Sequence, residues 1–480
     1  MPDISNVKKI VVAGAGMTGL MCALQLRKEH PNKPIVVFEK STHIGGMYSS
    51  IEYDTEGYIF DHGMHVIYES CNAKIDDLYR EIMPIADWHI YEGNEKDIAG
   101  LFFNGKLQDF SHYVDLRSYP KEQWQSYIAD FFTSLEQNSD SDSKTAMEYL
   151  RAHFGSVIAE DIHSKLLSNL YKINPEVIDI FAIKATALER VIMFDKELMI
   201  DLMKSDLIRT RLAFPDQINL PPYRANTQKA LYPKKFGMQG FLNRFRDKLH
   251  EQNIEILTGV DIQKLQCDNS HITHITLSNT EKGSYEIPVE TLVWTAGWSA
   301  LASSLKMDIS DLKFQRGPRI IYINLVLDRP PIMGRLYYFY CYDSGFGSFR
   351  VTSYSNYCPN ACQDGKYPVC VEFWPSRIGL NADETTDEQL IQLAIGELKE
   401  IGIIQDHQVI FAKAENLKSE FPLPSIVNTK NLQEIRTRIS KENIKNLTVA
   451  GIMAEEGLFF IPDILNDAFK KISKTSQTED

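Results

Sequence analysis

The sequence has no apolar run long enough to form a membrane-spanning helix, which needs about 20 consecutive, mostly apolar residues. Its polar start, MPDISNVKK, also lacks the apolar core of a secretory signal. These two absences argue against membrane insertion and against secretion. We therefore expect a cytoplasmic protein.

The sequence has no excess of basic residues either. Its 51 Lys and Arg residues are outnumbered by 64 Asp and Glu residues, and the formal net charge at pH 7 is -13. Proteins that bind nucleic acid through phosphate contacts need a basic surface. We expect no nucleic-acid partner.

Cysteine is scarce, with seven residues in the chain. An odd number in a long chain fits a reducing compartment better than a disulfide framework. The closest group is Cys358, Cys362 and Cys370, which has no nearby histidine and is a poor zinc pattern. We expect free thiols and no metal site.

What the chain does have is length and apolar content. Its 480 residues are 44% hydrophobic, enough for two or three domains, contiguous or interleaved. The first region predicts a βαβ unit. KIVVAGAG is a β-branched run that ends in glycine, TGLMCALQLRKEH has helical apolar spacing, and PIVVFEK is a second strand of the buried type.

The glycines between the first strand and the helix have the spacing Gly14-x-Gly16-x-x-Gly19, and Glu39 ends the next strand. Such a turn places backbone N–H groups and the positive helix end against a pyrophosphate, and a Cβ at Gly16 would occupy phosphate space. A carboxylate at Glu39 can accept hydrogen bonds from an adenosine ribose. The pattern favours dinucleotide binding over the alternative, a plain glycine turn with a surface glutamate.

The rest of the chain alternates between helical and strand patterns. From Pro120 to Lys204 the spacing is helical, in EQWQSYIADFFTSLEQ and VIDIFAIKATALERVIMF, with a polar loop EQNSDSDSK between them. From Pro318 to Trp374 it predicts strands, in PRIIYINLVLD, RLYYFYCYD, SFRVTSYSNY and PVCVEFW. Near the end, NLTVAGI predicts a short strand and PDILNDAFKKISK a helix.

The segment after Glu39, KSTHIGGMYSS, makes a family resemblance specific. The sequence resembles the FAD-dependent superfamily of amine oxidases, protoporphyrinogen oxidase-like proteins and UDP-galactopyranose mutases, in which a second glycine pair, here Gly45-Gly46, lies along the FAD. Amine oxidases usually carry an arginine after this pair. Met47 stands there in this chain, which disfavours the amine-oxidising branch.

Further segments extend the resemblance from the first strand to the last helix. They are YIFDHGMHVIYES, GLFFNGKLQDF, YPKKFGMQGFLNRFRDKL, ILTGVDIQKL, LVWTAGW and NLTVAGIMAEEGLFFIPDILNDAFK. The mutases have Gly-Arg in the last of these, where this chain has Gly451-Ile452. The resemblance implies bound FAD held by Gly14, Gly16, Met17, Thr18, Gly19, Glu39, Lys40, Gly45, Gly46, Met47, Gly63, Met64, His65, Gly237, Met238, Val260, Thr295, Ala296, Gly297, Gly451, Asp463, Ile464 and Leu465.

The expected fold class is α/β. A discontinuous Rossmann-type FAD-binding domain is predicted from residues 1–112, 236–316 and 412–480. A helical insertion lobe is expected over 113–235, and a mostly antiparallel β substrate domain over 317–411. The last two would cover the flavin and form the substrate cleft.

Two residues are candidate catalytic groups. The resemblance places the loop of His65 at the flavin, where an imidazole could move a proton near neutral pH; a buried structural histidine is the alternative, and it is our interpretation of His62. Arg350 could hold an anionic substrate bidentately or form a surface ion pair. Tyr354 and Asn356 alternate with Ser355 and could line the pocket.

Four functions stay open at this point, one of them a plain NAD dehydrogenase. The leading hypothesis is an FAD-dependent oxidoreductase that oxidises a small molecule by hydride transfer to the flavin. A mutase-like isomerase acting on a nucleotide sugar is the alternative, and a non-catalytic flavin-binding scaffold is the third. The sequence names neither the substrate nor the oligomeric state.

Overall fold

The computed structural model of the chain describes residues 7–137, 143–221, 227–279, 283–418 and 420–477. The chain divides into two compact units. The first unit comprises Met1–Ile90, Gln228–Lys313 and Lys430–Asp480; the second comprises Tyr91–Thr227 and Phe314–Thr429. Most of the predicted loop EQNSDSDSK, residues 138–142, lies outside the described residues.

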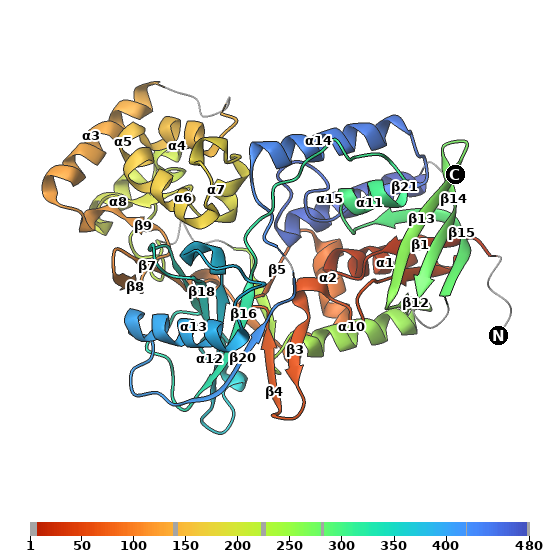
Figure 1. Cartoon of the computed structure of the whole chain (residues 1–480), viewed down its shortest axis with the longest axis horizontal. Helices are drawn as coiled ribbons and strands as arrows, with labels where there is room; N and C mark the ends of the chain where they lie inside the picture. Colours follow the sequence, from red (N-terminus) through yellow and green to blue (C-terminus); the bar gives the residue numbers. More distant parts are fainter. Residues whose placement is uncertain (1–6, 138–142, 222–226, 280–282, 419, 478–480) are drawn as a thin grey trace. The chain divides into compact units, whose positions relative to one another are not determined.

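The first unit contains a Rossmann-type parallel sheet (Figure 1). Its strands are short β-branched runs that are buried on both faces, as parallel strands usually are. Each pairs in parallel with its neighbour, in the order β12–β2–β1–β15–β21. The bounds are β12 Ile254–Leu257, β2 Ile35–Phe38, β1 Lys9–Ala13, β15 Gly283–Trp294 and β21 Leu447–Val449. The predicted βαβ unit and the final strand are confirmed.

Strand β15 is long because it belongs to two layers. Its end pairs with β1, while its start pairs antiparallel with β14 (His271–Asn279), which pairs with β13 (Val260–Asp268). Alternate residues of β1 and β2, such as Val11 and Val36, enter one apolar core with this layer. That core anchors the turn that follows β1.

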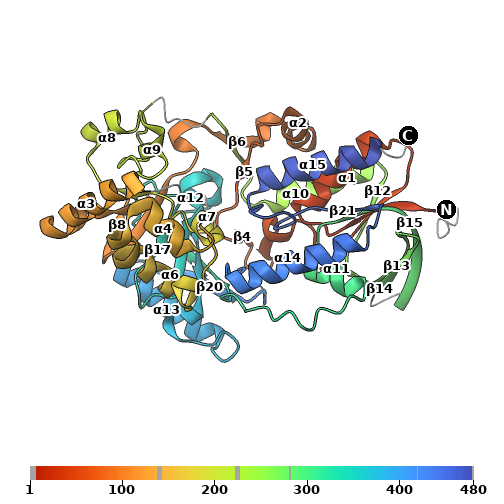
Figure 2. The ribbon, with the colours of Figure 1, turned by 90° about the horizontal axis from the view of Figure 1, so that it is seen from above.

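Helices cover both faces of this sheet. Figure 2 shows α1 (Met17–Glu29) and α15 (Ile461–Gln477) on one side, with α11 (Trp298–Ser304) and α14 (Ile426–Lys441) on the other. Leu301 of α11 and Ile435 of α14 belong to the apolar core described above. The remaining elements of the unit are β3 Ser50–Tyr53, β4 Tyr58–Asp61, β5 Ile67–Tyr68, α2 Ala73–Ile82, β6 Trp88–Tyr91, β11 Ala230–Pro233 and α10 Gln239–Glu251.

The second unit contains a seven-stranded, mostly antiparallel sheet with the order β20–β16–β19–β18–β17–β7–β8. Only the contact of β17 with β7 is parallel. The bounds are β20 Val409–Glu415, β16 Ile321–Leu327, β19 Tyr367–Phe373, β18 Ser348–Ser353, β17 Tyr338–Cys341, β7 Ala99–Phe103 and β8 Lys106–Gln108. Helix α13 (Asp387–Ile401) packs against β20 and β16.

This sheet moves two of the expected boundaries. Residues 91–112 belong to the second unit, because β7 and β8 extend its sheet. Residues 412–429 belong there too, because β20 pairs with β16. The helical residues share this unit with the sheet and do not form a separate one.

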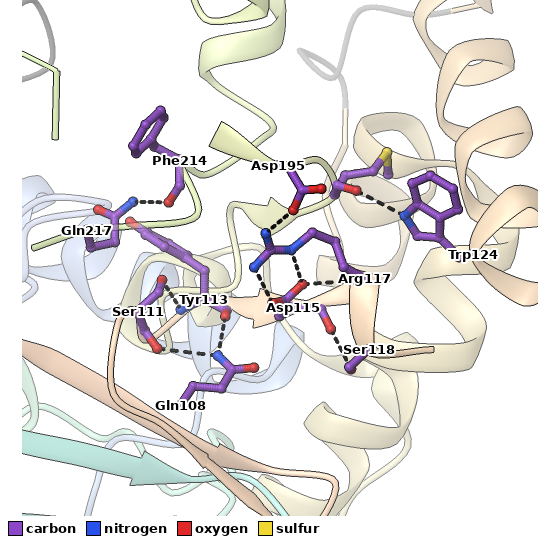
Figure 3. Close-up of polar contacts among 11 residues, drawn as sticks. Gln108, Ser111, Tyr113, Asp115, Arg117, Ser118, Trp124, Asp195, Phe214 and Gln217 are labelled. Carbon is purple, nitrogen blue, oxygen red and sulfur yellow. Dashed lines mark hydrogen bonds and ion pairs between the residues drawn. The ribbon is translucent and has the colours of Figure 1, made fainter. Parts of the chain in front are cut away.

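The helical part of the second unit begins at β9 (Val114–Asp115) and includes α3 (Lys121–Gln137), as predicted from EQWQSYIADFFTSLEQ. Figure 3 shows how its start is fastened: the Arg117 guanidinium donates to both carboxylate oxygens of Asp115, at 2.9 and 2.7 Å, and to Asp195 at 2.6 Å. The other helices are α4 Ala146–Phe154, α5 Ser156–Ile158, α6 Lys165–Tyr171, α7 Phe181–Ala185, α8 Lys196–Leu202 and α9 Asp206–Arg209.

One predicted helix of this part is wrong. The segment VIDIFAIKATALERVIMF forms only the five-residue α7, followed by the strand β10 (Val191–Ile192). Ala187 has a left-handed φ of 52°, which stops the helix, and β10 pairs in parallel with β9. The tertiary pairing prevails over the local helical spacing.

Candidate functional site

The three glycines of the turn after β1 are not all required for the same purpose. Gly14 has a φ of 101°, and a Cβ there would lie 2.6 Å from the Thr295 hydroxyl oxygen. A Cβ on Gly19 would lie 1.9 Å from the Gly14 carbonyl oxygen. Both positions need glycine for the turn and helix to pack together.

Gly16 differs from the other two. Its φ of -69° suits any residue, and no protein atom lies within 4 Å of the position of its Cβ. It stands at the start of α1, where backbone N–H groups lack helical partners. The protein itself does not require glycine here, so the open space is suited to a bound anion such as a pyrophosphate.

The Glu39 carboxylate is held in place by the backbone. One oxygen accepts a hydrogen bond from the Ala15 N–H at 2.8 Å, and the other accepts one from the Ser41 N–H at 2.8 Å. Each carboxylate oxygen has a second lone pair left for a ligand hydroxyl. The acid is thus oriented as a ribose site requires.

A cavity of about 440 Å³ lies beside Glu39 in the first unit. Five of the predicted cofactor residues line it: Gly14, Glu39, Lys40, Val260 and Ala296. Residues that the sequence did not single out complete the wall, namely Ala13, Phe38, Asp261, Ile262, Gln263, Trp294, Ala300, Ser303, Ser304 and Lys306. A wall of mixed apolar and polar side chains beside an oriented carboxylate suits an adenosine.

The second glycine pair lies against the first turn. The Gly45 N–H donates to the Ala15 carbonyl oxygen at 2.8 Å, and Gly45 forms a bridge with Gly16. A Cβ on Gly45 would lie 2.3 Å from a Leu242 methyl carbon of α10. Met47, two residues on, keeps 42% of its surface exposed. The pair is therefore held directly against the first glycine turn.

The turn after β15 closes the other side of the site. The Thr295 hydroxyl donates to the Ala13 carbonyl oxygen at 2.8 Å. Gly451 has a φ of 109°, and a Cβ there would lie 3.3 Å from the Thr295 carbonyl oxygen. Ile452 is 47% exposed, where the mutases have arginine. Three distant segments thus meet at the glycine turn.

The predicted residues at the start of α15 differ in their exposure to solvent. Asp463 is exposed, whereas the side chains of Ile464 and Leu465 are buried in the helix packing. Met17, Thr18, Met64 and Met238 are likewise buried. For these buried residues, any contact with a cofactor would come from the backbone.

Asp61 fastens the FDHGMH loop to the YPKKFGM segment. Its carboxylate, 1% exposed, accepts hydrogen bonds from the Ser50 hydroxyl at 2.5 Å, the Tyr232 hydroxyl at 2.5 Å and the Met238 N–H at 3.0 Å. Burial raises the pKa of Asp61, and these hydrogen bonds oppose the rise. Gly237, with a φ of 96°, donates to the Tyr232 oxygen at 3.2 Å.

His65 is half-buried at the end of this loop, and its ring lies edge-on to Tyr48, with the ring centres 5.5 Å apart. His62 is 4% exposed, and burial lowers its pKa. His65 is the more exposed of the two, and the roles of both histidines stay predictions. Gly63 between them has a φ of 74°, which bends the loop.

Arg350 lies on β18 of the second unit, and its Nε–H is donated to the buried carboxylate of Glu372 on β19. Arg350 thus forms an ion pair, as in the alternative to substrate binding, but with exposed side-chain fractions of 17% and 6% the pair lies within the sheet and not at the surface. Its partner was missed, because only the strand register brings position 372 beside position 350.

Tyr354 and Asn356 do not alternate along a strand as predicted. Residues Tyr354–Tyr357 form the short helix α12, in which Tyr354 is fully buried. The Asn356 amide donates to the carbonyl oxygens of Gly334 and Leu336, at 3.0 and 2.7 Å. These two contacts hold the turn after β18.

Within residues 7–137, 143–221, 227–279, 283–418 and 420–477, no group of three or more His, Cys, Asp or Glu side chains is placed to hold a metal ion. Over the same ranges, no helix has both the length and the apolar character to cross a bilayer.

The comparisons with known proteins agree with the geometry. Residues 12–82 match the family described as NAD(P)-binding Rossmann-like domain. No curated protein sequence matches the chain. Solved structures resemble it over nearly their whole lengths.

Three of them illustrate the likeness. A reduced UDP-galactopyranose mutase has a TM-score of 0.74 at 15% identity, over 98% of this chain and 95% of that one. A candidate protoporphyrinogen oxidase from Exiguobacterium sp. 255-15 has a TM-score of 0.69 at 16% identity, over 98% and 99%. A putrescine oxidase variant has a TM-score of 0.59 at 13% identity, over 98% and 99%.

The chain has the fold of these oxidases and of the mutase. The expected α/β architecture with a Rossmann-type domain and a second sheet is confirmed. Identities of this size establish the fold and leave the chemistry to be argued from the residues.

Proposed function

We propose that the protein is an FAD-dependent oxidoreductase that acts on a small molecule. The observation that carries the proposal is the open space at Gly16, beside a Glu39 carboxylate that the backbone already orients. A dinucleotide with a ribose and a pyrophosphate fits both features. The fold shared with two oxidases supports the redox assignment.

Different residues of the first unit would bind different parts of the cofactor. Gly16 and the start of α1 would hold the pyrophosphate, Glu39 the ribose, and the cavity wall at Val260 and Ala296 the adenine. The loops of Gly46, His65 and Gly451 would extend toward the ring. When bound, FAD supplies the acceptor for a hydride.

His65 would act on a proton at its imidazole. Its contact with Tyr48 limits the ring orientation, and the side chain stays partly exposed. An imidazole with this freedom can take or give a proton near neutral pH. Asp61 would position the loop through its hydrogen bonds to Ser50, Tyr232 and Met238.

The test is the content of the purified protein. We expect a yellow protein that releases FAD on denaturation, and flavin absorbance that bleaches under anaerobic conditions with the correct substrate. A colourless protein that takes up no added FAD would refute the proposal. Uptake of NAD without flavin would point to a plain dehydrogenase.

A mutase-like isomerase acting on a nucleotide sugar is the second candidate, because the mutase shares the fold at a TM-score of 0.74. Ile452 in place of the mutases' arginine argues against it. Turnover that requires prior reduction of the flavin and leaves it reduced would favour the isomerase. A flavin that no substrate reduces and that supports no turnover would favour a scaffold.

A further inference from the structure

Two rows of polar side chains cross one face of the second unit's sheet. Strand pairing places Tyr322, Glu372, Arg350 and Tyr340 side by side across β16, β19, β18 and β17. The next row holds Asn324, Cys370, Thr352 and Tyr338. Residues paired across strands share a face. Six of these eight side chains are buried, and Arg350 and Tyr340 are the two that are partly exposed. A polar ligand would therefore reach this face at those two residues.

Arg350 is the cation of the first row, and Glu372 fixes its direction. Glu372 takes the Nε–H, and Arg350 also bonds to the Tyr340 oxygen. The guanidinium lies 5.5 Å from the centre of the Tyr338 ring. Arg350 and Tyr340 are the partly exposed members of their row, so they are the side chains of that row within reach of a ligand.

The charge of Arg350 is already compensated. Desolvation acts to lower the pKa of Arg350, but Glu372 raises it well above the ordinary range, so the guanidinium stays charged and paired. An anion binding at Arg350 would have to give up its hydration next to a fixed carboxylate. The pair therefore acts as a dipole, and the guanidinium N–H groups that Glu372 and Tyr340 do not accept remain as donors.

The neighbouring charges add no positive surplus. Asp97, before β7, accepts a hydrogen bond from the Tyr338 hydroxyl at 3.3 Å. Burial raises the pKa of Asp97 to about 6, so it is ionised at pH 7, and Lys96 beside it supplies one opposing charge. Burial also raises the pKa of Glu372, and Arg350 opposes that rise. With both carboxyl groups ionised, the charges of Arg350, Glu372, Asp97 and Lys96 sum to zero.

Building on the proposed function, we propose that this polar face binds an uncharged oxygen of the substrate, a carbonyl or hydroxyl, through the N–H groups of Arg350, and disfavours carboxylates and phosphates. Glu372 is the positioning residue, since it holds the guanidinium and cancels its charge. This differs from the anion anchor that the sequence alone suggested.

The experiment compares acetamide with acetate, two probes of nearly equal shape that differ in charge. Saturation-transfer NMR on the FAD-containing, full-length protein measures both, at pH 7.5 and constant ionic strength. We expect acetamide to bind several-fold more tightly than acetate. Stronger binding of acetate, or no binding of either probe, would overturn the proposal.

Variants locate the effect. Glu372→Gln keeps a hydrogen-bond acceptor for Arg350 but removes the compensating charge, so the preference should reverse toward acetate. The double variant Arg350→Gln/Glu372→Gln should bind neither probe at this face; acetamide binding that survives in it would overturn the proposal. If Glu372→Gln fails to fold, the wild type and the double variant still decide.

A matched control is the ion pair of Arg319 with Asp383, in the same unit, at 2.6 Å. Asp383 is 64% exposed, so Asp383→Asn should leave the preference unchanged. Flavin content measured on each sample separates the two proposals. Missing FAD refutes the proposed function, whereas bound FAD with an acetate preference refutes only this inference.

Discussion

The two units form their candidate sites from different parts of the chain. In the first unit the backbone forms the site, and glycines such as Gly16 and Gly45 act by having no side chain. In the second unit, side chains on adjacent strands form it, as in the Arg350–Glu372 pair. The first kind of site depends on local spacing and the second on strand register.

The two kinds of site respond differently to amino-acid substitution. A backbone site tolerates changes in most side chains but no added Cβ where the ligand lies. A side-chain site tolerates little change in its paired charges, because removing either partner leaves the other buried and unpaired. The following variants test this difference, from the largest expected effect to the smallest.

Gly16→Val should abolish FAD binding, because the branched Cβ would occupy phosphate space. The unliganded protein should change its unfolding free energy by no more than about 1 kcal/mol, since no protein atom lies within 4 Å of that Cβ. Flavin content and melting temperature measure the two effects. Gly396→Val in α13, also without a neighbour within 4 Å, is the control that should keep FAD.

His65→Ala should keep FAD and slow turnover roughly 100-fold or more, the usual effect of losing a proton-transfer group. His62→Ala, which removes a buried ring, should chiefly lower the melting temperature. Steady-state kinetics with flavin content distinguish the two. Unchanged turnover in His65→Ala would remove this histidine from the site.

Asp97 should make folding stability depend on pH. Its pKa rises from 3.8 to about 6 on folding because of burial. The folded state therefore binds the proton more tightly, and its advantage is complete below pH 4 and is lost as the pH rises to about 6. Relative to Asp97→Asn, the wild type should lose about 1–3 kcal/mol over that range in urea titrations.

The exposed Asp383 provides the opposite sign as a control. Arg319 lowers its pKa, so its contribution is present above the unfolded pKa and is lost as the pH falls. Compared with Asp383→Asn, the wild type should lose stability toward acid. The same slope for both aspartates would contradict the burial of Asp97.

Arg350→Lys should have the smallest effect on the whole protein. It keeps the charge but loses both the planar fork and the Nε–H that Glu372 accepts. We expect unchanged FAD content, a lower melting temperature and several-fold weaker binding of acetamide. Acetamide binding equal to that of the wild type would mean that a single ammonium suffices there.

The fold of the first unit was largely predictable, because each of its signals is local. The β-branched run before Gly14 and the helical spacing after it predict the βαβ unit that the structure contains. The order of the later segments predicted the return of the chain to this sheet, seen in the pairing of β21 with β15. The cavity beside Glu39 brings together only some of the predicted residues, and their contact with FAD stays a prediction.

The second unit was harder to predict for a physical reason. Its boundaries depend on long-range pairing, such as β7 with β17, which no local pattern specifies. The Val177–Phe194 segment has helical spacing, but after α7 its last part forms β10 because it can pair with β9. Glu372 lies 22 positions from Arg350 and becomes its neighbour only through the register of β18 and β19.

The three-segment construction of the first unit has a consequence for synthesis in the cell. The glycine turn emerges early from the ribosome, but its wall at Gly451 follows β21, near residue 449. At about 5–20 residues per second, the nascent chain waits roughly 20–90 s before that wall exists. Until then β15 has an uncovered edge where β21 will pair. Under the proposed function, cofactor binding would therefore wait until β21 has been made, and ribosome-associated chaperones would meet an incomplete sheet.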